Sequence, residues 1–158
     1  MFRPMRRAAQ ALAPEDCLRL LETEKRGVLS LLGDEGYPYG VPLNHYYSRE
    51  EGLLYFHGGL LGHRVDAFRR CDKASYCVFD RGVPRDGGWA LDVRSVVVFG
   101  RLREVKDRDT LLNVTRLLSL KFTEDEEYIR RETEKFAAAT LLLAMQPEQI
   151  TGKLVNES

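Results

Sequence analysis

The chain has 158 residues, and its 24 Lys and Arg residues balance 24 Asp and Glu residues, so the formal net charge is zero. That balance argues against a dedicated nucleic-acid-binding protein, which normally needs a basic excess to displace counterions from phosphates. It also argues against a polybasic membrane-binding surface. The longest apolar stretches, residues 96–99 and 137–145, fall well short of the roughly 20 residues that span a bilayer. The length predicts one domain over residues 1–158.

The N-terminus and the cysteines indicate the cellular compartment in which the protein is expected. The first residues are basic but no apolar stretch follows them, so we predict no signal peptide. The three cysteines, Cys17, Cys71 and Cys77, cannot all pair within one chain, which predicts a reduced, cytoplasmic protein. A zinc site made by Cys71 and Cys77 with His57 and His63 is the alternative. The cysteines lack CxxC spacing, so we predict no metal.

In chain order, the sequence predicts a helix that begins at Pro14 and ends at Gly27, followed by short strands separated by glycine turns. Pro38 and Pro42 place the second strand at a sheet edge or a bulge, because proline cannot donate to a ladder. The predicted strands cover residues 28–32, 37–47, 53–57, 74–79, 94–105 and 140–146, and the later helices cover 62–70, 109–120 and 123–135.

Several details of this pattern can be tested against a structure. The apolar run at residues 96–99 predicts a strand that is buried on both faces. The last strand is expected to end at Pro147, residues 81–91 to form a loop, and residues 123–135 to form a charged, solvated helix. Tight turns between the first strands argue against a doubly wound parallel sheet. The predicted class is therefore mainly β, a small β-barrel with decorating helices.

The segment from Tyr55 to Arg64 carries the strongest chemical signal. A strand ends, glycines bend the backbone and a helix begins. The first turn of a helix presents unpaired N–H groups and a partial positive charge, so it can hold an anion. Arg64 lies in that turn, where a phosphate would offset its unfavourable position. The alternative interpretation is a glycine-rich turn with solvated His and Arg side chains.

The histidines are the remaining candidates for chemistry. His57 is expected at the rim of the barrel on the same strand face as Tyr55, either near a ligand or bonded to a carbonyl. The sequence contains no Ser-His-Asp order, HExxH motif or P-loop. If the protein is an enzyme, a bound cofactor is therefore expected to supply the chemistry, and His57 and His63 are the candidates for supplying protons.

An ordered set of motifs resembles a known family. The set comprises residues 1–7, 36–44, 55–58, 62–64, 94–100 and 151–153. Together they resemble the nitroimidazole-resistance (Nim-type) proteins of the pyridoxamine 5′-phosphate oxidase-like, flavin-binding split-barrel superfamily, over nearly the whole chain. The family usually has Lys where Arg64 stands, and Arg keeps the charge and adds a bidentate fork. The chain lacks the C-terminal Arg-Leu-x-Pro segment of true pyridoxamine phosphate oxidases, so vitamin B6 oxidation is disfavoured.

The resemblance implies a split β-barrel that forms a homodimer, with flavin mononucleotide (FMN) at the subunit interface rather than FAD or haem. It implies three groups of cofactor-binding residues. Those at the phosphate would be Gly62, His63 and Arg64; those along the isoalloxazine would be Val41, Pro42, Leu43 and Asn44; and those beside the ribityl chain would be Tyr55, Phe56, His57, Ser95 and Val96.

Several functions stay open from the sequence. The first is an FMN-dependent oxidoreductase that takes hydride from NADH or NADPH and reduces a small acceptor such as a nitroaromatic. The second is a haem-binding or haem-degrading split-barrel protein with His45, His57 or His63 as the axial ligand. The third is a flavin-binding module without catalysis. The last is a structural dimer with an empty cleft.

Overall fold

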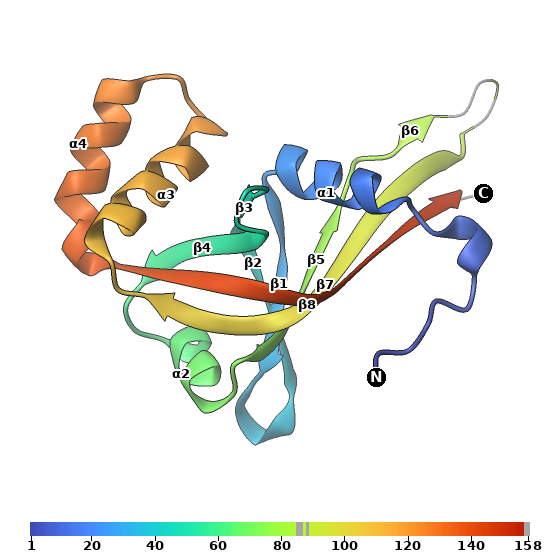
Figure 1. The fold of residues 1–158 in the computed structure, drawn as a ribbon, viewed down its shortest axis with the longest axis horizontal. Helices are drawn as coiled ribbons and strands as arrows, with labels where there is room; N and C mark the ends of the chain where they lie inside the picture. Colours follow the sequence, from blue (N-terminus) through green and yellow to red (C-terminus); the bar gives the residue numbers. More distant parts are fainter. Residues whose placement is uncertain (85–86, 88, 157–158) are drawn as a thin grey trace.

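The structure, a computed structural model, describes residues 1–84, 87 and 89–156. Within these residues one antiparallel sheet dominates, with the strand order β2-β1-β5-β7-β8-β4-β3 and with β6 beside β7 (Figure 1). The strands are β1 (Arg26–Leu32), β2 (Pro38–Asn44), β3 (Tyr46–Ser48), β4 (Leu53–Gly59), β5 (Lys73–Phe79), β6 (Val83–Pro84), β7 (Leu91–Val105) and β8 (Thr140–Asn156). The mainly β class and the antiparallel pairing are as predicted. The predicted loop at 81–91 includes β6, and its residues 85, 86 and 88 lie outside the described part.

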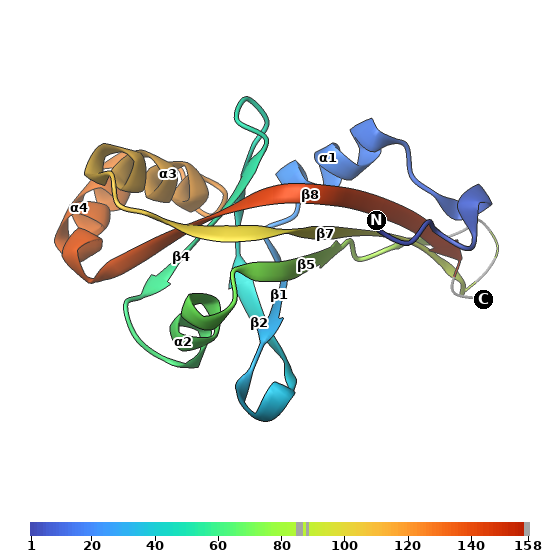
Figure 2. The same cartoon turned by 60° about the horizontal axis from the view of Figure 1, so that its bottom comes forward.

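The helices cover the ends and one side of this sheet (Figures 1 and 2). Pro14 and two acidic residues occupy the first turn of α1, as predicted. That helix ends at Thr23 rather than at Gly27, which lies within β1. None of the described helices is long and apolar enough to cross a membrane. The helices are α1 (Pro14–Thr23), α2 (His63–Arg70), α3 (Arg108–Leu120) and α4 (Glu126–Phe136), with short 3₁₀ turns at Ala8–Gln10, Asp34–Gly36 and Ala137–Ala139.

The predicted second strand is divided at His45 into β2 and β3, which lie at opposite edges of the sheet. The sheet is curled, and β2 also approaches β4 across its open side. The chain therefore crosses from one edge to the other at His45. Pro38 and Pro42 lie on an edge strand, as predicted, where a missing N–H interrupts no ladder.

Two predictions about the long strands are wrong. Val96 and Val98 are buried, but Val97 is half-buried and Phe99 is exposed, because β7 turns only one face to the core of the chain. Strand β8 continues past Pro147 to Asn156. The register between β7 and β8 shifts beside Gly100, which pairs with Pro147. A bulge of this kind accommodates proline within a strand.

Two hydrophobic clusters hold the sheet in shape. Strand β4 supplies both clusters, because successive side chains point to opposite faces. Leu54 and Phe56 join the main core inside the curled sheet, and Leu53 and Tyr55 join a second cluster with Val114 of α3. Helix α3 therefore packs on the outer face of β4.

A buried polar chain crosses the main core at the junction between β2 and β3. The His45 side chain is fully buried, with Nε2 2.7 Å from the carbonyl oxygen of Leu21 and Nδ1 2.9 Å from the hydroxyl of Tyr76. A carbonyl only accepts, so Nε2 donates to Leu21 and Nδ1 is an acceptor. The single hydroxyl proton of Tyr76 is shared between Nδ1 and the carbonyl oxygen of Leu43, which lies 3.0 Å from the hydroxyl. Burial and the positive charge of Lys121 lower the pKa of His45 to about 4. The imidazole is therefore neutral at physiological pH.

His45 should make the stability of the protein depend on pH. Between pH 6.5 and pH 4 the unfolded chain binds a proton at this residue that the folded protein excludes, so the folded state loses stability as the pH falls. We expect this one group to lower the free energy of unfolding by about 3 kcal/mol over that interval. Urea unfolding measured at several pH values checks this.

The variant His45→Gln isolates the effect from the other acid-sensitive groups. It should be less stable than the wild type at pH 7, and the difference should shrink as the pH approaches 4. A difference that stays constant over the whole range would contradict the burial of a neutral imidazole.

Candidate functional site

The strongest candidate site lies where β4 ends and α2 begins, beside the β1–β2 hairpin (Figure 2). Gly62 precedes the helix with φ 113°, a backbone conformation that favours glycine. Its carbonyl accepts from the amides of Val65 and Asp66 at 2.8 and 3.1 Å. The amides of His63 and Arg64 come earlier in the first turn, where a helix offers no acceptor. They are therefore available to an anion.

Arg64 gives this site an uncompensated positive charge. Its side chain is half-buried and its guanidinium lies against Gly58, so a Cβ at that position would overlap it. One nitrogen lies 3.4 Å from the carbonyl oxygen of Gly59, and no carboxylate among the described residues forms an ion pair with it. Burial lowers its pKa, yet arginine stays protonated in proteins. The charge is thus partly desolvated, and the described residues supply no counter-ion for it.

His57 lies next to this charge. Its side chain is half-buried near the end of β4, where His57 pairs with Leu142 of β8. Burial, and then the charge of Arg64, lower the pKa of His57 below its usual value of 6.5. The imidazole is therefore neutral at pH 7, with one nitrogen that donates and one that accepts. It can hydrogen-bond a polar ligand group without adding charge.

The ring of His63 has partners of its own. It stacks on Tyr39 with centroids 4.0 Å apart, and its Nε2 lies 3.5 Å from a carboxylate oxygen of Asp34. Asp34 also pairs with Arg70 at 2.7 Å. These contacts fasten α2 to the tip of the β1–β2 hairpin. The ring of His63 is thus engaged by the hairpin, and its backbone amide lies in the first turn of α2.

The predicted isoalloxazine-lining segment alternates along β2. Val41 and Leu43 pack against the main core, whereas Pro42 is exposed and Asn44 is half-buried. The side-chain oxygen of Asn44 accepts from Nε of Arg26 at 3.0 Å. Only Pro42 and Asn44 can therefore present side chains to a ligand from this segment, and the other two residues can present backbone.

Three other predicted residues have fully enclosed side chains. Phe56 and Val96 lie in the main core. Tyr55 lies in the second cluster, and its hydroxyl donates to Glu51 at 2.9 Å. A ligand could contact these three residues only through their backbone. Ser95 is half-buried on β7 opposite Phe79 of β5, away from Arg64 along the sheet.

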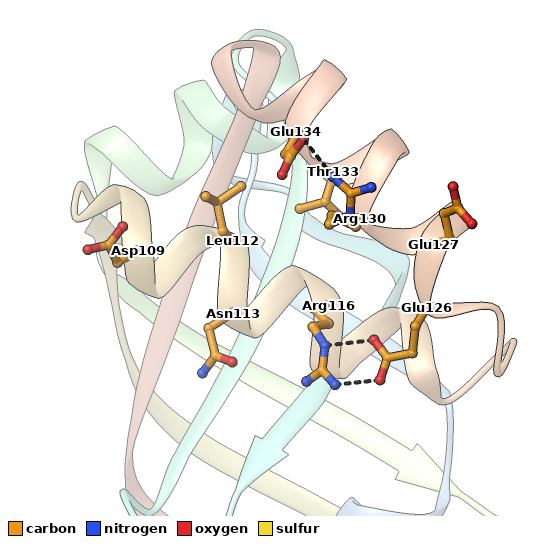
Figure 3. Close-up of a pocket in the computed structure, with 9 residues that line it drawn as sticks. All are labelled: Asp109, Leu112, Asn113, Arg116, Glu126, Glu127, Arg130, Thr133 and Glu134. Carbon is orange, nitrogen blue, oxygen red and sulfur yellow. Dashed lines mark hydrogen bonds and ion pairs between the residues drawn. The ribbon is translucent and has the colours of Figure 1, made fainter.

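A second hollow, of about 470 Å³, lies between α3 and α4 and was not predicted from the sequence (Figure 3). Its arginines are paired: Arg116 binds Glu126 with two hydrogen bonds, and Arg130 lies 3.8 Å from Glu134. Their charge is neutralised, unlike that of Arg64. Among the described residues, no three His, Cys, Asp or Glu side chains gather into a metal site.

Comparison with known proteins identifies the family of the chain. The family model described as pyridoxamine 5′-phosphate oxidase matches residues 13–154. The chain belongs to this family. No curated protein is significantly similar to it in sequence.

Solved structures share the fold at low sequence identity. A candidate 5-nitroimidazole antibiotic resistance protein from Bacteroides thetaiotaomicron superposes with a TM-score of 0.74 at 16% identity, covering 92% of this chain and 87% of that one. The flavocytochrome Anf3 from Azotobacter vinelandii gives 0.77 at 18%, covering 97% and 72%. A FAD-binding protein from Mesorhizobium loti gives 0.64 at 24%, covering 92% and 97%. The predicted split-barrel fold is thus confirmed.

The site fits a phosphate ester better than a metal or a neutral ligand. Within the described part of the chain, a guanidinium without a carboxylate partner, the amides of the first turn of α2 and a neutral histidine together supply donors for a dianion. Sequence reasoning found Arg64 and the helix start from the glycines before them. It missed Tyr39, which stacks on His63 and so positions α2, because only the fold brings the hairpin to the helix.

An uncompensated Arg64 should cost stability in the ligand-free protein. The variant Arg64→Met keeps the apolar stem and removes the desolvated charge. We expect its free energy of unfolding without ligand to equal that of the wild type or to exceed it by up to about 1 kcal/mol. Chemical denaturation of dialysed protein measures this.

Arg49→Met is the matched control. Arg49 binds Glu22 and Glu15 at 2.6 and 3.0 Å, so its removal should lower stability. A loss of stability in Arg64→Met as large as that in Arg49→Met would show that Arg64 has a structural role.

Proposed function

We propose that this protein is a Nim-type, FMN-binding oxidoreductase that transfers electrons from NADH or NADPH to a small acceptor such as a nitroaromatic. The observation that carries the proposal is the half-buried guanidinium of Arg64, which has no carboxylate partner among the described residues. Family membership supports it, as do relatives of the same fold named as a FAD-binding protein, a flavocytochrome and a candidate nitroimidazole resistance protein. A cytoplasmic location is part of the proposal.

Different residues would contact different parts of the cofactor. Arg64 and the amides of the first turn of α2 would hold the phosphate. His57 would hydrogen-bond the chain that leads from it, and Pro42 and Asn44 would contact the ring. The chemistry that a bound flavin supplies is acceptance of a hydride and onward transfer of two electrons.

The haem alternative gains no support from the buried histidine. Both ring nitrogens of His45 are engaged, by Leu21 and Tyr76, so ligation of iron would break a buried hydrogen bond. His63 is stacked on Tyr39. His57 lies beside the charge of Arg64, which favours an anion.

Flavin binding and reduction test the function. Purified protein should be yellow and should release FMN on denaturation. Under anaerobic conditions NADH or NADPH should bleach the flavin, and a nitroaromatic should restore its colour. A colour that persists with both donors would indicate a binding module, and a Soret band that shifts on substitution of one histidine would indicate haem.

The same titration tests the role of Arg64. Arg64→Ala should weaken FMN binding by about 1–3 kcal/mol, the loss expected for a charge-assisted phosphate contact. Gly58→Ala should also weaken binding, because the added Cβ displaces the guanidinium. Arg69→Ala, an exposed arginine on the same helix, is the control. Equal affinities for all three variants in a fluorescence titration would remove Arg64 from the phosphate site.

The proposal includes a homodimer with the cofactor at the subunit interface. Phe99 is 41% exposed on the outer face of β7, where it stacks on Phe2. An exposed apolar ring on the outer face of a sheet favours a contact with a second copy.

Mass measurement at several protein concentrations checks the dimer. We expect a dimer that releases flavin when it is diluted to monomer. Phe99→Glu should favour the monomer, whereas Tyr128→Glu, on exposed α4, should not. A monomer that retains its flavin would contradict the placement of the cofactor between subunits.

A further inference from the structure

A hollow of about 610 Å³ lies at the end of the barrel away from α2. Its walls come from the end of α1, the start of β1, the middle of β2, the end of β5 and the residues after α3. The volume is within the range of sites that hold small molecules. The lining residues used below are Lys25, Arg26, Pro42, Phe79, Arg81 and Phe122.

The hollow has an excess of positive charge. Lys25, Arg26 and Arg81 line it, and Glu24 is its one carboxylate. Among the described residues none of the three cations takes part in an ion pair; Arg26 donates to the neutral side chain of Asn44 at 3.0 Å. Cations gathered around a concave surface without counter-ions attract an anionic ligand.

Two aromatic rings line the same hollow. Phe79 and Phe122 are 58% and 41% exposed, so both rings present apolar surface to the solvent. The ammonium of Lys25 lies 5.2 Å from the centre of the Phe122 ring. A flat apolar ring would cover this exposed aromatic surface, and an anion attached to it would meet the cations.

The position of the hollow connects it to the proposed flavin site. Pro42 belongs to the segment proposed to contact the flavin ring, and Tyr39, three residues earlier on β2, belongs to the α2 end. Three residues of a strand span roughly 10 Å. A phosphate at Arg64 therefore leaves Pro42, and the hollow beside it, at the ring end of the cofactor. Phe79 also pairs with Ser95 across the sheet.

We propose that this hollow binds the second substrate, a small organic anion with one flat aromatic ring. Arg81 and Lys25 hold the anionic group, while Phe79 and Phe122 contact the ring. The electron transfer to or from this ligand rests on the proposed function, whereas its binding does not. The protein is therefore specific for aromatic acids over neutral aromatic compounds.

Calorimetric titration with 4-nitrobenzoate tests the proposal, and neutral 4-nitrobenzamide is the matched probe. The purified protein is titrated with each compound, with and without FMN. We expect the benzoate to bind at least tenfold more tightly than the amide, and to bind in the presence of FMN. Arg81→Ala and Lys25→Ala should each weaken the benzoate about tenfold and leave the amide unchanged.

Arg108→Ala is the control, since Arg108 is an exposed arginine at the start of α3. Arg81 makes no hydrogen bond or ion pair among the described residues, so its variant should fold, and its thermal midpoint verifies this. Lys25→Ala gives a second variant on a different element.

The outcomes separate this inference from the proposed function. Equal binding of benzoate and amide, or unchanged binding to both the Arg81 and Lys25 variants, overturns the inference even if FMN binds. Mutually exclusive binding of benzoate and FMN also overturns it, because the hollow would then belong to the cofactor. Charge-dependent benzoate binding by a protein that binds no flavin supports the anion site and refutes the proposed function.

Discussion

The fold depends on a chain crossing at a buried histidine. β2 and β3 lie at opposite edges of the curled sheet but are separated by His45 alone, so the two edges must meet at this residue. The junction is buried, and each unpaired polar backbone group there would cost free energy. His45 and Tyr76 bind the carbonyl groups of Leu21 and Leu43 there. Lys121, at the end of α3, donates to the carbonyls of Glu24 and His45. Closure of the barrel is thus secured by side chains rather than by a strand ladder.

Arg64 differs from the polar groups around His45, because the described residues supply no partner that neutralises its charge. Most arginines with resolved contacts are compensated by carboxylates, such as Arg94 by Asp80 at 2.8 Å and Arg101 by Asp72 at 3.0 Å. Arg64 is half-buried, has no such partner among the described residues and lies beside a neutral histidine, so only the carbonyl of Gly59 replaces the solvation that burial removes. A folded protein keeps a half-buried charge of this kind at a position where a bound ligand supplies the missing counter-charge. This contrast between compensated and uncompensated arginines carries more information than the glycine motif alone.

Local chemistry made much of the fold predictable. Pro14 marked the start of α1, Gly36 and Gly52 marked turns with positive φ, and two prolines marked an edge strand. Features set by partners across the sheet could not be predicted. Strand β8 passes Pro147 only because β7 shifts register beside Gly100, and no pattern within residues 140–156 reveals that shift.

The same limit applied to the candidate site. Spacing identified Arg64 and the start of α2, and resemblance to a family indicated the β2 segment. Neither shows which of residues 41–44 face outward, because that depends on which face of β2 meets the core. Neither the spacing nor the resemblance predicts that Lys25, Arg81 and Phe122 line one hollow, since these residues come from three separate parts of the chain. Charged residues that a sequence predicts to be solvent-exposed form a site only when the fold brings them close together.

Strand β2 links these observations. Its Tyr39 end is held to α2 through stacking on His63, and its other end is held by the carbonyl contact of Leu43 with Tyr76. The strand is at a sheet edge, where backbone would otherwise be free to move or to pair with other chains. Fixing both ends keeps the outward-facing Pro42 at a constant distance from Arg64. A ligand that contacts both residues would then meet a preformed surface, and its binding would not have to overcome the entropy of ordering this edge strand.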